Sequence, residues 1–222
     1  MLTALENGVK GGRWYSLIDK VWDRKTLNQA WKQVAENHGA AGVDRISIER
    51  FGAKADQYLE ELEQVLRSGR YTPEAVRRVH IPKGPGQTRP LGIPTVKDRV
   101  VQTALKMVLE PIYEWEFMPM SYGFRPGVGC KDALREVDER LKEGDTWVVD
   151  ADLKSYFDTI PHEPLLERVG EKVSDGRIHG LLKGFLNQQI MEGLECWRPT
   201  TLGLFTMEEA WRTASRSRCG NC

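Results

Sequence analysis

The sequence has no apolar run long enough to cross a membrane, and its first residues lack the apolar segment of a secretory signal peptide. Cysteine is scarce, with four in 222 residues. Its one C-x-x-C pair, Cys219 and Cys222, has neither a second pair nor a following histidine, which argues against a zinc site and a disulfide framework. These absences predict a cytosolic protein with reduced thiols.

The chain also has no net charge, because its 32 Lys and Arg residues balance its 32 Asp and Glu residues. The charge is uneven along the chain, since only Glu74 and Asp98 are acidic between Arg67 and Arg99. The basic residues of this segment are Arg67, Arg70, Arg77, Arg78, Lys83, Arg89, Lys97 and Arg99. Such a cluster can bind a polyanion, and an ordinary solvated basic face has the same composition. Composition leaves both interpretations open.

The chain lacks internal repeats and low-complexity tracts, so we expect one large or two small globular domains. Apolar residues at helical spacing predict helices over 14–37, 47–67, 130–142, 162–170 and 175–190, and one that starts after Thr95. Strands are predicted over 75–82 and from Trp147, with Gly- and Pro-rich loops over 83–94 and 121–129. Helices with a few strands indicate the α+β class.

Two local patterns make these predictions more specific. Thr95, followed three residues later by Asp98, resembles a capping box, which fixes the start of its helix. In the helix over 130–142, the residues at helical spacing are expected to face the core. They are Ala133, Leu134, Val137 and Leu141.

The segment VVDADLKSYFDTI, residues 148–160, places carboxylates directly after apolar residues that are typical of a core strand. On a strand, Asp150, Asp152 and Lys154 share one face. A buried carboxylate must be paired or metal-bound, because its desolvation costs several kcal/mol. An ion pair and a divalent cation both meet this requirement. Phosphatases of the haloacid dehalogenase type also place D-x-D after a strand, although Lys154 departs from their pattern.

Four segments, taken in order, point to one family. They are AAGVD (40–44), IPKGPGQTRPLGIPTVKDRVVQTAL (81–105), SYGFRPG (121–127) and DADLKSYFDTIPHEPLL (150–166). Together they resemble the reverse transcriptases encoded by bacterial group II introns, and the resemblance covers residues 14–203. It implies an α+β right-hand polymerase fold with fingers and an incomplete palm, in the bacterial cytoplasm and without a membrane partner.

The resemblance also implies a division of the chain and a reaction. The parts are an N-terminal helical extension of the fingers (1–70), the fingers (71–145), a partial palm (146–203) and an atypical tail (204–222). Members of the family copy an RNA template by Mg²⁺-dependent transfer of a nucleotide from a dNTP to the 3′-hydroxyl of a DNA primer. Group II intron RNA is a further implied partner.

In the palm, the resemblance makes Asp152 the catalytic aspartate and a ligand of a two-magnesium site, with the backbone carbonyl of Leu153 as another ligand. Phe157 corresponds to the aromatic residue under the incoming sugar, where a ring collides with a 2′-hydroxyl. Plain core packing is the alternative for this ring. Asp150 is interpreted as support for Asp152, and Asp158 as the start of a turn.

In the fingers, Lys83 and Arg89 correspond to the residues that hold the incoming triphosphate. Arginine can grip two phosphate oxygens, whereas lysine acts as a point charge. The alternative is two exposed cations on a mobile loop. Arg77 and Arg78 are assigned to the template backbone, and Arg125 to a nucleic-acid contact. The four histidines lack metal-ligand spacing and are expected to be structural.

The chain departs from the family after PTTLG (199–203), where Thr-Pro-Gln-Gly should follow and LFTMEEAWRTASRSRCGNC stands instead. It contains neither a Gln-Gly nor an Asp-Asp dipeptide, so the family's Tyr-Ala-Asp-Asp turn is missing. A frameshift or an early stop is the expected cause. One aspartate cannot hold two divalent ions about 3.5–4 Å apart.

We therefore expect a polymerase fragment that is inactive by itself. The alternative is a non-catalytic, maturase-like fragment that binds intron RNA. The sequence leaves open whether a second chain completes the palm.

Overall fold

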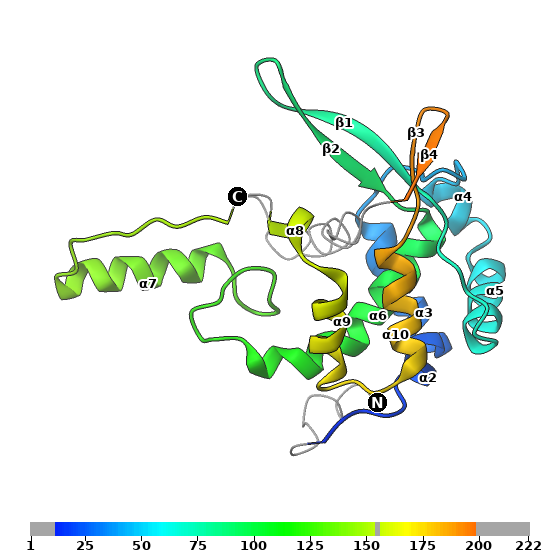
Figure 1. Ribbon diagram of the computed structural model, residues 1–222, viewed down its shortest axis with the longest axis horizontal. Helices are drawn as coiled ribbons and strands as arrows, with labels where there is room; N and C mark the ends of the chain where they lie inside the picture. Colours follow the sequence, from blue (N-terminus) through cyan, green and yellow to red (C-terminus); the bar gives the residue numbers. More distant parts are fainter. Residues whose placement is uncertain (1–11, 154–155, 199–222) are drawn as a thin grey trace.

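The computed structural model describes residues 12–153 and 156–198. A helical body carries a long β-hairpin and a separate helical arm (Figure 1). The helices are α2 (Ile18–Trp22), α3 (Arg24–Glu36), α4 (Ile48–Gly52), α5 (Ala55–Arg67), α6 (Val96–Tyr113), the 3-10 helix η1 (Glu114–Glu116), α7 (Cys130–Glu143), α8 (Tyr156–Thr159), α9 (His162–Gly170) and α10 (Gly176–Leu186). The expected α+β class is confirmed. Within the described residues, no helix has the length and apolar content needed to cross a bilayer.

The first two predicted helices are each divided in the structure. Residues 14–37 contain α2 and α3, which meet at Asp23. The carboxylate of Asp23 accepts hydrogen bonds from the backbone N–H groups of Lys25 and Thr26, and this cap starts α3. Residues 47–67 likewise divide into α4 and α5. The apolar spacing continues across both breaks, so it does not reveal them.

The core lies among α2, α3, α5, α6 and α10, each of which turns its apolar stripe inward. Val100 and Val101 of α6 are fully buried. Phe51 is also fully buried, and its ring centroid lies 4.6 Å from that of Trp31 and 4.8 Å from that of Tyr58. Burial of one such side chain stabilises the fold by about 1.5–3 kcal/mol. The body can therefore hold surface groups in fixed positions.

The loop between α9 and α10 is tied to the start of α2 through Asp175. This carboxylate caps α10 by accepting the N–H of Arg177 at 3.0 Å. It also accepts the N–H groups of Leu17 at 2.8 Å and Ile18 at 2.9 Å. Burial opposes the ionisation of Asp175, but these backbone donors outweigh it and lower the pKa of the carboxyl. The two helices predicted here are confirmed.

Four strands form one sheet in the order β2-β1-β3-β4. They are β1 (Val76–Gly84), β2 (Gln87–Ile93), β3 (Ile190–Glu192) and β4 (Glu195–Trp197). β1 pairs antiparallel with β2 and parallel with β3, where Val76 is opposite Ile190. The strand predicted over 75–82 is confirmed. The loop predicted over 83–94 is wrong, because β2 occupies most of it.

The position of β2 explains why its composition misled the prediction. β2 is an edge strand, so Pro90 can stand opposite His80 without needing an N–H group for a further neighbour. At the hairpin tip, Gly86 has a φ of 69°, a conformation that favours glycine. The short strands β3 and β4 were not predicted at all.

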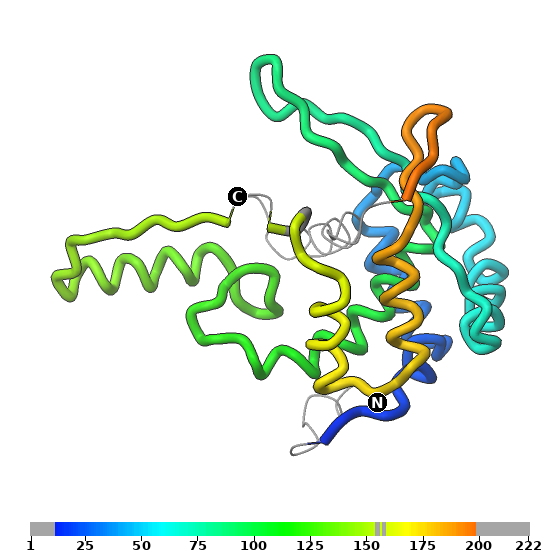
Figure 2. Tube along the Cα trace, viewed as in Figure 1, coloured from blue at the N-terminus to red at the C-terminus, as the bar shows by residue number. Residues whose placement is uncertain are grey.

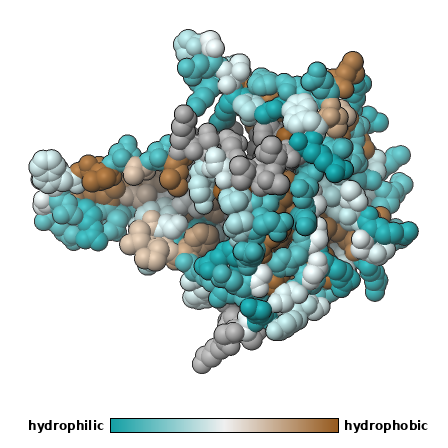
Figure 3. Space-filling model, in the orientation of Figure 1, coloured by the Kyte–Doolittle hydropathy of each residue, from teal (hydrophilic) through white to brown (hydrophobic). Residues whose placement is uncertain are grey.

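We use the name arm for residues 130–153, which comprise α7 and the extended segment that follows it. In Figures 1 and 2 the two pieces run beside each other, away from the body. α7 forms as predicted but buries none of its residues. Leu134 is 66% exposed, and Val137 and Leu141 are also exposed, so the prediction that they face the core is wrong. Apolar side chains are visible on the arm in Figure 3.

The strand predicted from Trp147 is wrong as well. The segment is extended but pairs with no strand in the described part of the chain, and Trp147 is 95% exposed. Val148 and Val149 are exposed beside it. A strand forms only where a neighbour accepts and donates its backbone hydrogen bonds, and the described residues offer none here.

Candidate nucleic-acid interface

The β1–β2 hairpin carries the two cations that the sequence assigns to the incoming triphosphate. Arg89 pairs with Ile81, and Lys83 lies at the irregularity between Pro82 and Gly84. Lys83 and Arg89 are therefore close along the hairpin, and an irregularity of this kind redirects a side chain. Both residues are exposed. Neither forms an ion pair with another described residue, so both charges are available to a ligand.

A buried carboxylate at the start of α6 holds the base of this hairpin. Asp98 accepts hydrogen bonds from the Tyr71 hydroxyl at 2.5 Å, the backbone N–H of Glu74 at 3.2 Å and the side-chain amide of Gln188 at 3.1 Å. Burial raises the pKa of Asp98 to about 6, against the lowering effect of hydrogen bonds from Tyr71 and Thr95. The carboxyl thus joins α6 to the segments that lead into β1 and β3.

The predicted cap at Thr95 is confirmed, but the prediction did not include the role of the Asp98 carboxylate. Thr95 accepts the backbone N–H of Asp98 at 3.1 Å, as a cap requires. The Asp98 carboxylate turns instead toward Glu74 and Gln188, and the Gln188 amide also donates to the Glu74 carbonyl at 2.5 Å. Sequence reasoning missed this role. The available signal was an acidic residue on the apolar face of α6.

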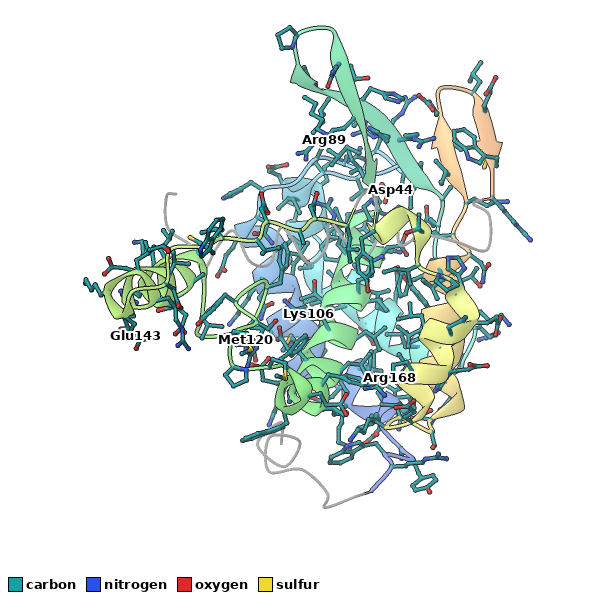
Figure 4. The ribbon with its side chains drawn as sticks, turned by 60° about the vertical axis from the view of Figure 1, so that its left-hand side comes forward. Asp44, Arg89, Lys106, Met120, Glu143 and Arg168 are labelled. Atoms are coloured by element: carbon teal, nitrogen blue, oxygen red, sulfur yellow. The ribbon has the colours of Figure 1, made fainter. Side chains whose placement is uncertain are left out.

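The AAGVD segment is fixed against the start of α6. A Cβ atom on Gly42 would lie 2.7 Å from the backbone of Thr95, so only glycine permits this approach. The Arg99 guanidinium donates to the carbonyl of Ala40 at 2.7 Å. Burial lowers the pKa of Arg99, while Asp44 opposes that shift. Figure 4 labels Asp44 in this segment and Arg89 on the hairpin.

Arg77 and Arg78 are adjacent in β1 and therefore point to opposite faces of the sheet. By the strand register, Arg77 lies on the face that also carries Arg89. Arg78 lies on the opposite face of the sheet, where it contacts side chains of β3 and β4. Its guanidinium lies 4.0 Å from the Glu192 carboxylate and 5.6 Å from the ring centroid of Trp197. The two arginines, which the sequence treats as equivalent, have different surroundings.

The residues predicted to bind metal lie in the arm and do not converge. Asp150 and Asp152 are exposed on the extended segment, and Leu153 is exposed next to them. No group of three or more His, Cys, Asp or Glu side chains could hold a metal ion among the described residues. Two exposed carboxylates on one unpaired segment do not fit a two-metal site, which requires ligands from several directions.

Phe157 and Asp158 lie in α8, and their side chains are outside the described residues, as is Lys154. The predicted contact of the Phe157 ring with the sugar of a nucleotide therefore stays a prediction. Asp158 was expected to start a turn, whereas its backbone belongs to a short helix.

Arg125 is engaged inside the protein. Its guanidinium contacts the Glu114 carboxylate at 2.8 Å and donates to the carbonyls of Met118 at 3.0 Å and Ser121 at 2.8 Å. It also lies 5.3 Å from the ring centroid of Phe117. These contacts close the loop that precedes the arm. The nucleic-acid contact assigned to Arg125 stays a prediction.

The chain is similar to several known proteins. The family model described as "Reverse transcriptase (RNA-dependent DNA polymerase)" matches residues 81–205. Protein YkfC of Escherichia coli (strain K12) is 44% identical over 172 residues, which cover 75% of this chain and 45% of that protein. The group II intron-encoded protein LtrA of Lactococcus lactis subsp. cremoris is 34% identical over 166 residues, which cover 73% of this chain and 27% of LtrA.

A solved structure, "Partial Cas6-RT-Cas1--Cas2 complex", contains a chain with a similar fold. The TM-score is 0.53 at 17% identity, over 91% of this chain and 34% of that chain. At this identity the likeness concerns the fold alone. The chain spans less than half the length of YkfC, LtrA and this structural neighbour.

Proposed function

Because the chain belongs to the reverse transcriptase (RNA-dependent DNA polymerase) family, we propose that it supplies the fingers and part of the palm of a group II intron-type enzyme. In this proposal the fingers comprise 71–145 and the partial palm 146–203. The reaction is transfer of a nucleotide from a dNTP to the 3′-hydroxyl of a DNA primer on an RNA template. The supporting observation is the β1–β2 hairpin, with Lys83 and Arg89 exposed above a fixed base. Family membership leaves the phosphatase alternative without support.

The hairpin acts by binding and orienting the triphosphate. The Arg89 guanidinium bridges two phosphate oxygens, and the Lys83 ammonium adds a point charge. Both groups are in solvent, so the ligand reaches them without breaking an ion pair with another described residue. Asp98 holds the base of the hairpin and so preserves its direction. Arg77, on the face that carries Arg89, contacts a phosphate of the template strand.

Reverse transcriptases use divalent metal ions, and we propose Mg²⁺ as the ion that Asp152 and the Leu153 carbonyl help to bind. Phe157 selects against a ribose in the same proposal. The described residues do not supply the remaining carboxylates of such a site. No catalytic step is therefore assigned to this chain alone, and the purified chain should not extend a primer on RNA.

The proposal is tested by dNTP binding in the presence of Mg²⁺. Arg89→Ala and Lys83→Ala should each weaken dNTP affinity about tenfold, because each removes a charge-assisted contact to phosphate. Arg67→Ala is the matched control, since this exposed arginine lies at the end of α5, outside the hairpin. Equal affinities for the hairpin variants and the control would contradict the proposal.

A second function, a non-catalytic fragment that binds intron RNA, is supported by the isolated position of Asp152 on the arm. The similarity to the group II intron-encoded protein LtrA also favours it. Asp152→Ala separates the two functions. RNA affinity should persist in this variant if the chain is a binding fragment, whereas any primer extension by the wild-type chain should vanish if the chain is a polymerase.

A further inference from the structure

The arm presents an apolar stripe that the described part of the chain leaves largely open. Leu134, Val137 and Leu141 of α7 are 66%, 53% and 55% exposed. Their spacing of three and four residues places them on one face of the helix. Apolar residues repeat in this way where two helices pack along a common seam. The stripe therefore has the pattern of an interface between helices.

The extended segment of the arm enlarges this apolar surface. Trp147, Val148 and Val149 are 95%, 82% and 92% exposed, and Figure 1 shows the segment running beside α7. Both pieces of the arm extend away from the body, as Figure 2 shows, so a second molecule can reach them. Neighbouring apolar side chains that are exposed on this scale mark an interaction site.

The charges beside the stripe indicate which partner fits it. Lys131 and Asp138 lie on the same flank of the stripe, about two helical turns apart. When two copies of α7 pack antiparallel, this flank of one helix meets the same flank of the other, and charges at such positions set the orientation. Lys131 of each copy then lies opposite Asp138 of the other copy. Leu134 of each copy packs against Val137 of the other.

A parallel pair of helices lacks this match. In that arrangement Asp138 would face Ala133, and Lys131 would face the loop before α7. The two charges are also accessible in the single chain. Lys131 is exposed and forms no ion pair with another described residue. The Lys142 ammonium contacts Oδ2 of Asp138, and a carboxylate with two oxygens can accept from a second cation.

We propose that two copies of this chain associate through their arms, with the two α7 helices antiparallel. The stripe of each copy covers the stripe of the other, and the pairs between Lys131 and Asp138 fix the direction. The 14 residues of α7 span about 21 Å, so the interface falls near the lower limit of about 1,200 Å² for specific complexes. A dissociation constant of about 10–100 μM is expected, with a monomer below about 1 μM.

Sedimentation velocity of the full chain, from about 1 to 200 μM, measures this association. The wild-type chain should pass from monomer to dimer over that range. Leu134→Glu should stay monomeric, because it places a charge in the apolar seam. Leu194→Glu is the matched control and should dimerise like the wild-type chain, since Leu194 is fully exposed between β3 and β4, outside the arm.

A charge exchange tests the direction of the helices. Asp138→Lys sets lysines opposite each other and should weaken the association about tenfold or more. Adding Lys131→Glu restores the pairs with their signs exchanged, and the double variant should regain at least about a third of the wild-type affinity. Glu139→Lys is the control, with an effect below about twofold, since Glu139 is exposed on the side of α7 away from the stripe.

Circular dichroism of the same variants at about 1 μM, where the chain is a monomer, separates lost association from lost helix. All variants should keep the helix content of the wild-type chain, because Leu134 and the substituted charges are exposed. If Leu134→Glu has less helix, the comparison of Asp138→Lys with its double variant decides the result.

A chain that stays monomeric at about 200 μM overturns the inference and assigns the stripe to a different partner or to another segment of the protein. Equal effects of Leu134→Glu and Leu194→Glu also overturn it, as do equal effects of Asp138→Lys and Glu139→Lys. The inference does not rest on the proposed function. The hairpin cations are unchanged in every variant, and dNTP binding is measured separately with the monomer.

Discussion

Helices α5 and α7 are both amphipathic but lie in opposite environments. α5 buries Leu59, Leu62 and Leu66 in the body, whereas α7 buries no residue and leaves Leu134 66% exposed. An apolar stripe shows that a helix can be covered on one side. The stripe does not show whether the element that would cover it lies in the same part of the chain. The stripe of α5 is covered by other helices of the body, whereas no described residue buries the stripe of α7.

The polar contacts of the two regions differ in the same way. In the body, Asp98 and Asp175 join segments that are far apart in sequence. On α7 the described ion pairs are local, between residues three or four positions apart, as for Lys142 and Asp138. The stability of α7 therefore depends on contacts between its own turns, whereas the stability of the body depends on long-range contacts.

The largest expected difference comes from one substitution made in both regions. Leu59→Ala should lower the free energy of unfolding by about 2–5 kcal/mol, because it opens a cavity in the body. Leu134→Ala should change it by less than about 0.5 kcal/mol, because the side chain is already in solvent. Urea denaturation of the full chain measures both values. A cost for Leu134→Ala as large as that for Leu59→Ala would mean that the arm is covered in solution.

The next effect is a pH dependence of the free energy of unfolding, which arises from Asp98 in the body. The folded-state pKa of Asp98, about 6, lies above its ordinary value of 3.8, so the folded state holds the proton more tightly. The stability from this group is complete below pH about 4 and is lost as the pH rises through 6. The free energy of unfolding should fall by roughly 2–3 kcal/mol over this range.

Denaturation measured from pH 4 to pH 7 should show that slope, and Asp98→Asn should remove it. Asp138→Asn, on an exposed turn of α7, is the control and should leave the slope unchanged. Asp175 acts in the opposite direction, because its lowered pKa gives stability that is lost as the pH falls through its folded-state pKa. A profile for Asp98→Asn that still follows the wild-type slope would exclude Asp98 as its source.

A smaller effect is expected from the contact between the AAGVD segment and α6. Gly42→Ala should cost about 1–3 kcal/mol, because the new Cβ atom would lie 2.7 Å from the Thr95 backbone. Gly123→Ala is the matched control in the loop before the arm, where no atom of a described residue lies within 4 Å of the new Cβ. Thermal denaturation should separate the two variants by several degrees. Equal melting temperatures would show that the segment is free to shift.

The smallest effect concerns the arm alone. Lys142→Ala removes an ion pair with Asp138 whose atoms are 2.5 Å apart, and it should weaken α7 by about 0.3–0.5 kcal/mol. Amide hydrogen exchange should become faster in α7 and remain unchanged in α6. Faster exchange in both helices would show that arm and body are coupled.

Much of the fold could be predicted from the sequence. The helices of the body, the strand β1 and the cap at Thr95 follow from apolar spacing and capping patterns. The family resemblance, drawn from four short segments, is confirmed by the family model that matches residues 81–205. The breaks inside two predicted helices and the edge strand β2 were missed, because caps and register, rather than composition, determine them.

The roles assigned to the basic residues of the hairpin stay predictions, and the sequence did not indicate what surrounds these residues. Lys83 and Arg89 are exposed, although they lie in the strands β1 and β2 and not in the predicted loop. The separation of Arg77 from Arg78 depends on which strand lies beside β1, and β3 is too short for its pattern to be recognised. The carboxylates at 150 and 152 looked like residues of a core strand, but a strand exists only with neighbours to bond to.

The pairing of β1 with β3 has a consequence for the synthesis of the protein. The Gln188 amide and the Glu74 carbonyl, which close the base of the hairpin, are 114 positions apart. At the usual speed of translation, β1 leaves the ribosome about 6–20 s before β3. During that interval β1 has an open edge at Val76, and such edges are sites of aggregation. Folding of this sheet should therefore be slow and late, and a ribosome that pauses before residue 190 should increase the demand for chaperones.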